Sequence, residues 1–330
     1  MAVQLGYALS SEEHGPLELV RNARRAEEAG FTFAMISDHF HPWTDRQGNS
    51  PFVWSVLGGI AQATTGLRVG TAVTCPTIRI HPAIIAQAAA TTSLLFEGRF
   101  FLGLGSGENL NEHILGQRWP PADQRLDMLD EAVEVMRLLW KGGMKTHRGR
   151  HYTVENAKVY NLPQRPPDVF LAAAGRRAAA LAGKVADGLI VVAPQDQTVE
   201  AFRQAGGGGK PVIGQVKVCH AASEEVGART VMEWWPTMAV PGALNSELSL
   251  PSQFEQAAKS ATEEQLRKLV PCGPDPARHL AAIQKYVDIG VEQVYVHQIG
   301  PDQEGFLRFY EREIIPVISA GAAPGRARRA

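Results

Sequence analysis

Cysteine is scarce in this chain of 330 residues, which holds only three, Cys75, Cys219 and Cys272. They lie far apart without a CxxC spacing, so we expect reduced thiols in the cytoplasm and neither a disulfide framework nor a zinc site. An excess of charge is missing too, because 33 Lys and Arg face 34 Asp and Glu. The formal net charge of −1 argues against a nucleic-acid or anionic membrane surface, since either needs a basic excess.

Several other signals are absent. No uninterrupted apolar stretch is long enough to cross a bilayer, and the start, MAVQLGYALSSEEHG, holds no basic segment followed by an apolar core, so we expect no signal peptide. The glycines of residues 103–112 are not followed by the Lys and Ser or Thr of a Walker loop, and no GxSxG elbow occurs. His39 and His41 lack a third ligand at useful spacing, so we expect no metal site.

What the chain does contain is a regular alternation of short β-rich runs and amphipathic helical stretches. The expected strands cover residues 4–10, 31–39, 67–74, 99–107, 168–175, 187–194, 211–221 and 291–299, and a helical segment follows each. Alternating units imply parallel strands with helical crossovers, and eight of them favour a closed (β/α)8 TIM barrel of the α/β class. An open doubly wound sheet is the alternative, but its Gly-rich fingerprint is absent after the first strand.

Two segments interrupt the alternation. Residues 143–167, after the fourth strand and its helix, are less regular, and a long, mainly helical segment follows strand seven through residue 270. We therefore expect one barrel domain over residues 1–320 with insertions after strands four and seven. The basic end, GAAPGRARRA, predicts a disordered tail over residues 321–330.

A barrel of this kind carries its catalytic residues at the carboxyl ends of its strands. The second expected strand ends in MISDHFHPW, residues 35–43. Alternation puts Ser37 and His39 on one face and Asp38 on the other, so we expect His39 to point into the barrel mouth, where it can remove a proton near neutral pH. Trp43 offers a flat apolar wall. The structural alternative is that His39 bonds a backbone carbonyl and Trp43 only covers the barrel.

Two glycine- and alanine-rich segments follow other strands. GLGSGENLNE, residues 103–112, places Glu108 after three glycines, where it could tune a neighbour's pKa, donate a proton, or begin a helix. LAAAGRRAAALAG, residues 171–183, passes from strand to helix, where backbone donors with Arg176 or Arg177 could receive a phosphate. Tight strand–helix packing with exposed arginines explains this second segment equally well.

Four strings, SDHFHPW, TCPTIRIHPAIIAQAAAT, GLGSGENLNE and ADGLIVV, occur in this order over nearly the whole chain. In this arrangement the sequence resembles the luciferase-like flavin and deazaflavin oxidoreductases. Within that superfamily it is most similar to the branch that uses coenzyme F420, which includes glucose-6-phosphate dehydrogenases and secondary-alcohol dehydrogenases. The resemblance implies a TIM barrel with insertions and a homodimer.

The resemblance also implies roles for individual residues. His39 would accept the hydroxyl proton as hydride leaves the substrate for the deazaflavin, Glu12 would support it, Trp43 would pack beside the reacting centre, and Glu108 would act near the ring. A non-proline cis peptide is implied between Ala72 and Val73. The residues that match cofactor-contacting segments are Asp38, Ala72, Val73, Thr74, Ser106, Gly107, Asn111, Ala173, Ala174, Gly175 and Arg176.

One departure from the branch concerns the substrate. The glucose-6-phosphate enzymes hold the sugar phosphate with lysines, and the matching positions here are Gln195 and Gln256, which lack the charge that a phosphate dianion needs. Arg278 could supply one cation, and Lys259 lies near in sequence. We therefore expect a neutral alcohol or sugar-like substrate rather than a sugar phosphate. The alternatives are an FMN-dependent monooxygenase on the same fold and a non-catalytic ligand-binding relative.

Overall fold

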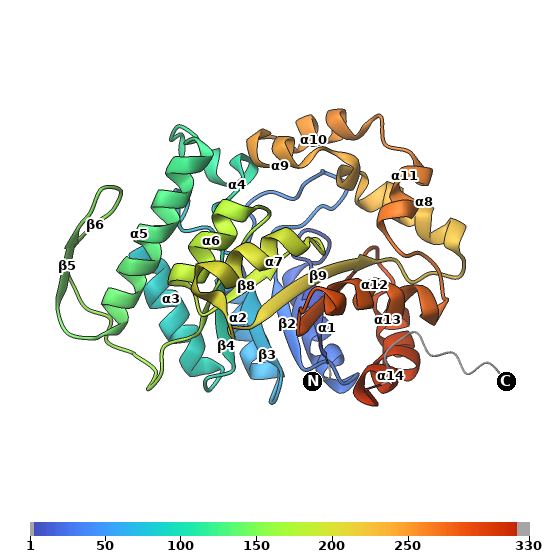
Figure 1. The fold of residues 1–330 in the computed structure, drawn as a ribbon, viewed down its shortest axis with the longest axis horizontal. Coiled ribbons are helices and arrows are strands. Elements are labelled where there is room, and N and C mark those ends of the chain that lie inside the picture. The colour runs from blue at the N-terminus through green and yellow to red at the C-terminus, as the bar shows by residue number, and fades with distance from the viewer. Residues whose placement is uncertain (1–2, 322–330) are drawn as a thin grey trace.

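Eight parallel strands close into a barrel in the computed structural model, which describes residues 3–321 (Figure 1). Their order around the barrel is β1-β10-β9-β8-β7-β4-β3-β2. The strands are β1 (Gln4–Leu9), β2 (Phe33–Ile36), β3 (Arg68–Thr71), β4 (Phe100–Leu104), β7 (Val169–Ala172), β8 (Gly188–Val191), β9 (Val212–Val218) and β10 (Gln293–Gln298). Each falls within an expected strand, so the predicted (β/α)8 barrel is confirmed.

The helices that connect successive strands surround the barrel because they turn apolar faces toward it. In α1, Pro16 occupies the first turn and Leu19, Ala23 and Ala26 are buried, as the helical spacing predicts. The helices are α1 (Pro16–Glu28), α2 (Val53–Ala63), α3 (Pro82–Leu95), α4 (Asn109–Glu112), α5 (Ala122–Trp140), α6 (Arg176–Val185), α7 (Asp196–Phe202), α8 (Glu224–Trp234), α9 (Gly242–Glu247), α10 (Pro251–Ala258), α11 (Glu263–Leu269), α12 (Pro276–Asp288), α13 (Gln303–Phe309) and α14 (Ile315–Ser319).

Aromatic side chains fill the inside of the barrel. Each of the rings of Phe33, Phe101 and Phe170 lies against a glycine on the neighbouring strand, where a Cβ atom would overlap the ring. With Met35, Tyr295 and smaller residues they form one buried cluster inside the strands. The packed interior provides a closed floor, so a ligand cavity can form only above it, toward the strand ends.

The segment 143–167 is more ordered than its sequence indicates. It forms an antiparallel hairpin of β5 (Lys145–Arg148) and β6 (Thr153–Ala157), which stands away from the barrel in Figure 1. The carboxylate of Glu131 in α5 accepts the backbone N–H groups of Arg150, His151 and Tyr152 at the hairpin turn. This anchor comes from another element, and the local sequence therefore could not indicate it.

The second insertion carries α8 to α11 and reaches back across the barrel mouth. The side chain of Asn109 in α4 donates a hydrogen bond to the carbonyl of Glu247 at the end of α9 over 2.9 Å, and Figure 1 shows these helices side by side. Arg125 of α5 lies 3.4 Å from the carboxylate of the same glutamate. The insertion is therefore tied to the loop that follows β4. Apart from Gly321, the predicted tail lies outside the described residues.

Candidate active site

A cavity of about 440 Å³ opens at the carboxyl ends of the barrel strands. Every strand of the barrel, or the segment directly after it, contributes residues to its wall. The predicted site residues on this wall are Glu12, His39, Trp43, Ala72, Val73, Ser106, Gly107, Glu108, Ala173 and Ala174. The structure thus gathers side chains from five separate loops at the place where a barrel enzyme holds its substrate.

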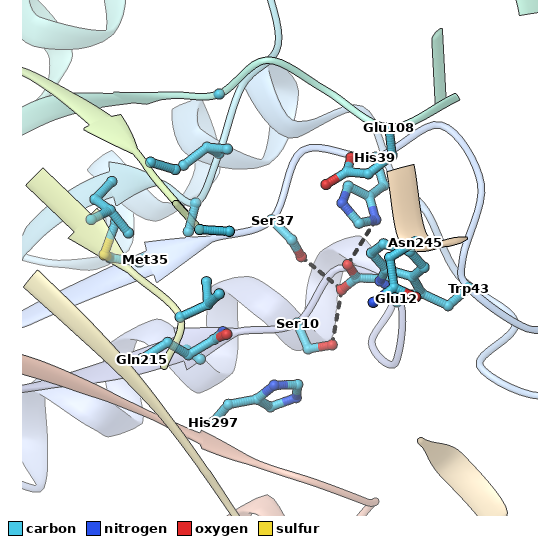
Figure 2. Close-up of a pocket in the computed structure, with 18 of the residues that line it drawn as sticks. Ser10, Glu12, Met35, Ser37, His39, Trp43, Glu108, Gln215, Asn245 and His297 are labelled. Carbon is cyan, nitrogen blue, oxygen red and sulfur yellow. Dashed lines mark hydrogen bonds and ion pairs between the residues drawn. The ribbon is translucent and has the colours of Figure 1, made fainter. Parts of the chain in front are cut away.

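Glu12 and His39 form the polar centre of the cavity (Figure 2). The Nδ1 atom of His39 lies 2.9 Å from Oε1 of Glu12. The other carboxylate oxygen accepts hydrogen bonds from the hydroxyls of Ser37, over 2.7 Å, and Ser10, over 3.0 Å. Because an ionised carboxylate only accepts, Nδ1 carries the proton in this pair, and Nε2 of the neutral ring keeps a free lone pair.

Burial and charge act in opposite directions on this pair. Burial alone raises the pKa of Glu12, but His39 and the Ser37 hydroxyl outweigh it and lower the pKa from 4.5 to about 2. For His39, burial lowers the pKa, while Glu12 and more weakly Glu108 raise it, and the net shift is upward from 6.5. Glu12 is therefore ionised near neutral pH, and His39 is a stronger base than a free imidazole.

Trp43 packs edge-on against His39, with ring centroids 5.4 Å apart. Its other neighbour is Phe254 of α10, whose ring centroid lies 5.1 Å away and which is completely buried. The backbone N–H of Trp43 donates to the side chain of Gln47. The indole is thereby fixed between the imidazole and the second insertion, so it limits the space beside Nε2 of His39.

Small residues and backbone form the other half of the cavity. Ala72 and Val73 after β3 are joined by a cis peptide bond, as expected, and Ser106 and Gly107 follow β4. Gly107 has a φ of +81°, and a Cβ atom there would overlap the thiol of Cys75. In the strand order, β7, β4 and β3 are consecutive, β3 adjoins β2, and β7 lies opposite β1. The cavity therefore has room for a flat ring between small residues and the imidazole.

Asp38, Thr74 and Asn111 lie behind the cavity wall. Thr74 donates a 2.7 Å hydrogen bond to the buried carboxylate of Asp38. The side-chain oxygen of Asn111 accepts the backbone N–H groups of Phe40 and His41 over 2.9 and 3.1 Å. These three predicted cofactor contacts join neighbouring loops instead of lining the cavity. For Asp38 the reason is that it points to the side opposite His39.

Arg79 and Glu112 were not singled out from the sequence. The guanidinium of Arg79 lies 2.7 Å from the carboxylate of Asp38 and 3.6 Å from that of Glu112, and all three side chains are buried. Burial lowers the pKa of Arg79, but both carboxylates raise it and the net shift is upward. One cation thus holds together the loops that follow β2, β3 and β4. The spacing of these residues along the chain contains no signal for this contact.

The remaining predicted residues are not brought to the cavity. Gly175 and Arg176 begin α6, where Arg176 is exposed. Gln195 caps α7 and accepts a hydrogen bond from Thr198, and Gln256 lies on the exposed face of α10. Arg278 pairs with Glu224 and lines a second cavity of about 510 Å³.

Other polar side chains on the wall were missed or left without a role. Gln215 and Lys217 of β9 and His297 of β10 line the cavity. Alternation along β9 could have identified the first two, since Ile213, Gln215 and Lys217 share the inward face. Over residues 3–321, no group of three or more His, Cys, Asp or Glu side chains is arranged to hold a metal. None of the helices in that range has the length and apolar character needed to span a bilayer.

The family model described as luciferase-like monooxygenase matches residues 3–293. The chain is 34% identical to an F420-dependent glucose-6-phosphate dehydrogenase of Segniliparus rotundus, over 96% of this chain and 98% of that one. It is 33% identical to the enzyme of the same name from Microbacterium testaceum, over 95% of this chain and 97% of that one. Among solved structures, an F420-dependent secondary alcohol dehydrogenase in complex with an F420-acetone adduct superimposes with a TM-score of 0.90. It is 27% identical in sequence, and the match covers 96% of this chain and 99% of that one.

These matches confirm the resemblance expected from the sequence. The fold is shared with an F420-dependent tetrahydromethanopterin reductase from Methanopyrus kandleri, which superimposes with a TM-score of 0.76 at 20% sequence identity. That match covers 96% of this chain and 100% of the other. The family model covers most of the chain, and the two dehydrogenases exceed 30% identity over nearly their full lengths. The chain belongs to the luciferase-like family.

Proposed function

We propose that this protein is an F420-dependent oxidoreductase that interconverts the CH–OH group of a small alcohol or sugar-like substrate and the corresponding carbonyl. The observation that carries the proposal is the carboxylate–imidazole pair of Glu12 and His39 at the mouth of the barrel, with Nδ1 and Oε1 2.9 Å apart. The relatives named F420-dependent dehydrogenases support the choice of cofactor and of reaction.

The residues of the cavity suit a deazaflavin. Ala72, Val73, Ser106, Gly107 and Ala173 would lie against it, because their small side chains leave one half of the cavity free for a flat ring. When bound, the deazaflavin supplies a two-electron acceptor for the hydride of the carbinol carbon.

The chain's own residues handle the proton. His39 accepts the hydroxyl proton at Nε2, because Glu12 holds Nδ1 as a donor and stabilises the imidazolium that forms. Trp43 restricts the substrate to the space beside this nitrogen. Glu108 lies on the wall next to the small-residue half, where its carboxyl can act as an acid or as an electrostatic partner. In the reverse direction the same imidazole returns its proton to the carbonyl oxygen.

Further parts of the proposal concern substrate, assembly and location. We propose a neutral substrate because the positions that match the lysines of the sugar-phosphate enzymes carry Gln195 and Gln256. Contacts of Gln195, Gln256 and Arg278 with substrate, and of Asp38, Thr74, Asn111, Gly175 and Arg176 with cofactor, remain predictions from the resemblance. A homodimer is proposed on the same resemblance, and a cytoplasmic location on the three scattered cysteines.

Anaerobic titration with F420 and with FMN, followed by addition of alcohols and sugars, tests the function. We expect F420 to bind and to be reduced by an alcohol, and His39→Ala to lower kcat/KM roughly 10²- to 10⁴-fold. His151→Ala, in the β5–β6 hairpin outside the cavity, is the control and should leave kcat/KM unchanged. Tight FMN binding with oxygen consumption, or full activity of His39→Ala, would contradict the proposal.

A further inference from the structure

His297 on the wall of the same cavity forms a second carboxylate–imidazole pair, with the buried Glu13 behind it. The Nε2 atom of His297 lies 2.7 Å from Oε2 of Glu13, and the backbone N–H of Gly300 donates to Oε1 over 2.8 Å. Burial raises the pKa of Glu13, but the hydrogen bonds from His297 and Gly300 outweigh it and lower the pKa. Glu13 is therefore an ionised acceptor, and Nε2 of His297 must carry the proton. In the neutral ring, Nδ1 is left as an acceptor.

Within residues 3–321, Nδ1 of His297 makes no hydrogen bond to the protein. The ring stands edge-on to Trp235, with centroids 4.9 Å apart, and this contact fixes its orientation. Its position on the cavity wall is visible in Figure 2. The free nitrogen is thus available to a hydroxyl of a bound molecule.

Lys217 lies beside His297 on the wall, because the two residues are register partners on β9 and β10. Its Nζ atom lies 5.1 Å from the ring centroid of Trp235. Over residues 3–321 no carboxylate lies within 4.0 Å of this ammonium, and it makes no hydrogen bond to the protein. Burial lowers the pKa of Lys217, and Glu12 and Glu13 oppose that shift without cancelling it. The ammonium therefore offers free donors close to the free acceptor of His297.

We propose that Lys217 and His297 together bind a hydroxyl group of the substrate that is remote from the reacting carbon, so that the substrate is a polyol of monosaccharide size. This inference rests on the proposed function. A hydroxyl both donates and accepts, and it matches an ammonium that only donates beside an imidazole nitrogen that accepts. An apolar group in this place would leave the buried ammonium without a hydrogen-bond partner.

Charge argues against an anionic group at the same place. The carboxylates of Glu12 and Glu108 lie on the wall of this cavity, and Glu13 lies directly behind His297. Lys217 is the one lysine or arginine on the described wall of this cavity. The lone pair of His297 would also face the anion. A neutral hydroxyl meets neither obstacle, in agreement with a substrate that carries no phosphate.

The strand order sets the separation between the two ends of the substrate. His39 follows β2, His297 belongs to β10, and β1 lies between them. Neighbouring strands are about 4.8 Å apart, so the two backbones are separated by roughly 10 Å around the barrel. The side chains converge toward the axis, and a substrate that contacts both carries its two hydroxyls on separate parts of the molecule. A monosaccharide ring places hydroxyls at both ends.

The test compares D-glucose, analogues that each lack one hydroxyl, and 2-propanol as substrates of the F420-loaded protein. In the natural protein we expect one deoxy analogue to have a kcat/KM roughly 10- to 100-fold below that of glucose. Lys217→Met and His297→Gln should abolish this preference, mainly through KM, and leave 2-propanol turnover within about twofold. Lys184→Met, an exposed lysine of α6 that lines neither cavity, is the control and should change the turnover of neither substrate.

Equal kcat/KM values for glucose and all its analogues would overturn the inference. So would equal losses on glucose and 2-propanol in Lys217→Met, because the lysine would then act on the reaction or on the fold. Turnover of 2-propanol but of no sugar would preserve the proposed function and overturn this inference. If no alcohol reduces the cofactor, saturation-transfer NMR with glucose tests the hydroxyl site separately. A transfer signal that disappears in Lys217→Met supports the site. A signal that is unchanged in Lys217→Met, or that is absent from the unsubstituted protein, refutes the site.

Discussion

Replacing Glu12 by glutamine removes the charge behind the proposed base and keeps the size of the side chain. The pKa of Glu12 is lowered from 4.5 to about 2. At about 1.4 kcal/mol per pKa unit, its surroundings favour the ionised carboxyl by about 3 kcal/mol. Most of this interaction is with His39, so the imidazolium in Glu12→Gln loses its main stabilising partner while burial remains.

Two results follow for Glu12→Gln. The acidic limb of the kcat/KM profile should move to lower pH, because burial lowers the pKa of His39 once the carboxylate is gone. At the optimum, kcat/KM should fall about 100-fold, since the ring is no longer held with its proton on Nδ1. Profiles of F420 reduction against pH measure both. Glu18→Gln removes a carboxylate of α1 that lies 3.2 Å from Nδ1 of His14, and it should leave the profile unchanged.

The same variant changes how stability depends on pH. The folded-state pKa of Glu12 lies below its unfolded value, so its contribution is fully present above pH 4.5 and disappears as the pH falls toward 2. In urea unfolding experiments, the free energy of unfolding of Glu12→Gln should therefore fall less between pH 4.5 and pH 2 than that of the unsubstituted protein. An acidic limb that stays in place or moves to higher pH in Glu12→Gln would refute the assigned role of the ion pair.

Two further predictions concern the loops around the cavity. Arg79→Met leaves the carboxylates of Asp38 and Glu112 buried without their cation. It should therefore lower the free energy of unfolding, measured by urea titration, by about 3–5 kcal/mol. An unchanged urea midpoint would contradict the assigned contacts. Gly107→Ala combines a φ of +81° with a methyl group that would overlap the buried thiol of Cys75, so it should weaken F420 binding in fluorescence titrations. Gly98→Ala is the control, because Gly98 has a φ of +83° with no atom within 4 Å of the added Cβ, and it should leave F420 binding unchanged.

Features that repeat along the chain could be predicted from the sequence. The alternation of strands and helices specifies the barrel, and the period of two residues in a strand correctly separates His39, on the cavity wall, from Asp38, behind it. His41 remains outside the cavity, where its Nδ1 lies 2.9 Å from the carbonyl of Leu110.

Contacts between distant parts of the chain could not be predicted in this way. Glu13 and His297 are 284 positions apart and meet only because the barrel closes between β1 and β10. The buried contacts of Arg79 likewise depend on how three loops settle over the strand ends. A strand pattern indicates which face a side chain occupies, but it does not indicate its partner across the barrel.

The adjacent residues Glu12 and Glu13 orient two imidazoles that belong to different strands, His39 after β2 and His297 in β10. A single inserted or deleted residue before Glu12 would therefore misplace both pairs at once. During evolution this loop can change its side chains, but its length is constrained by two sites together. Relatives that retain the doublet of glutamates and both histidines are accordingly the ones in which to look for the same substrate preference.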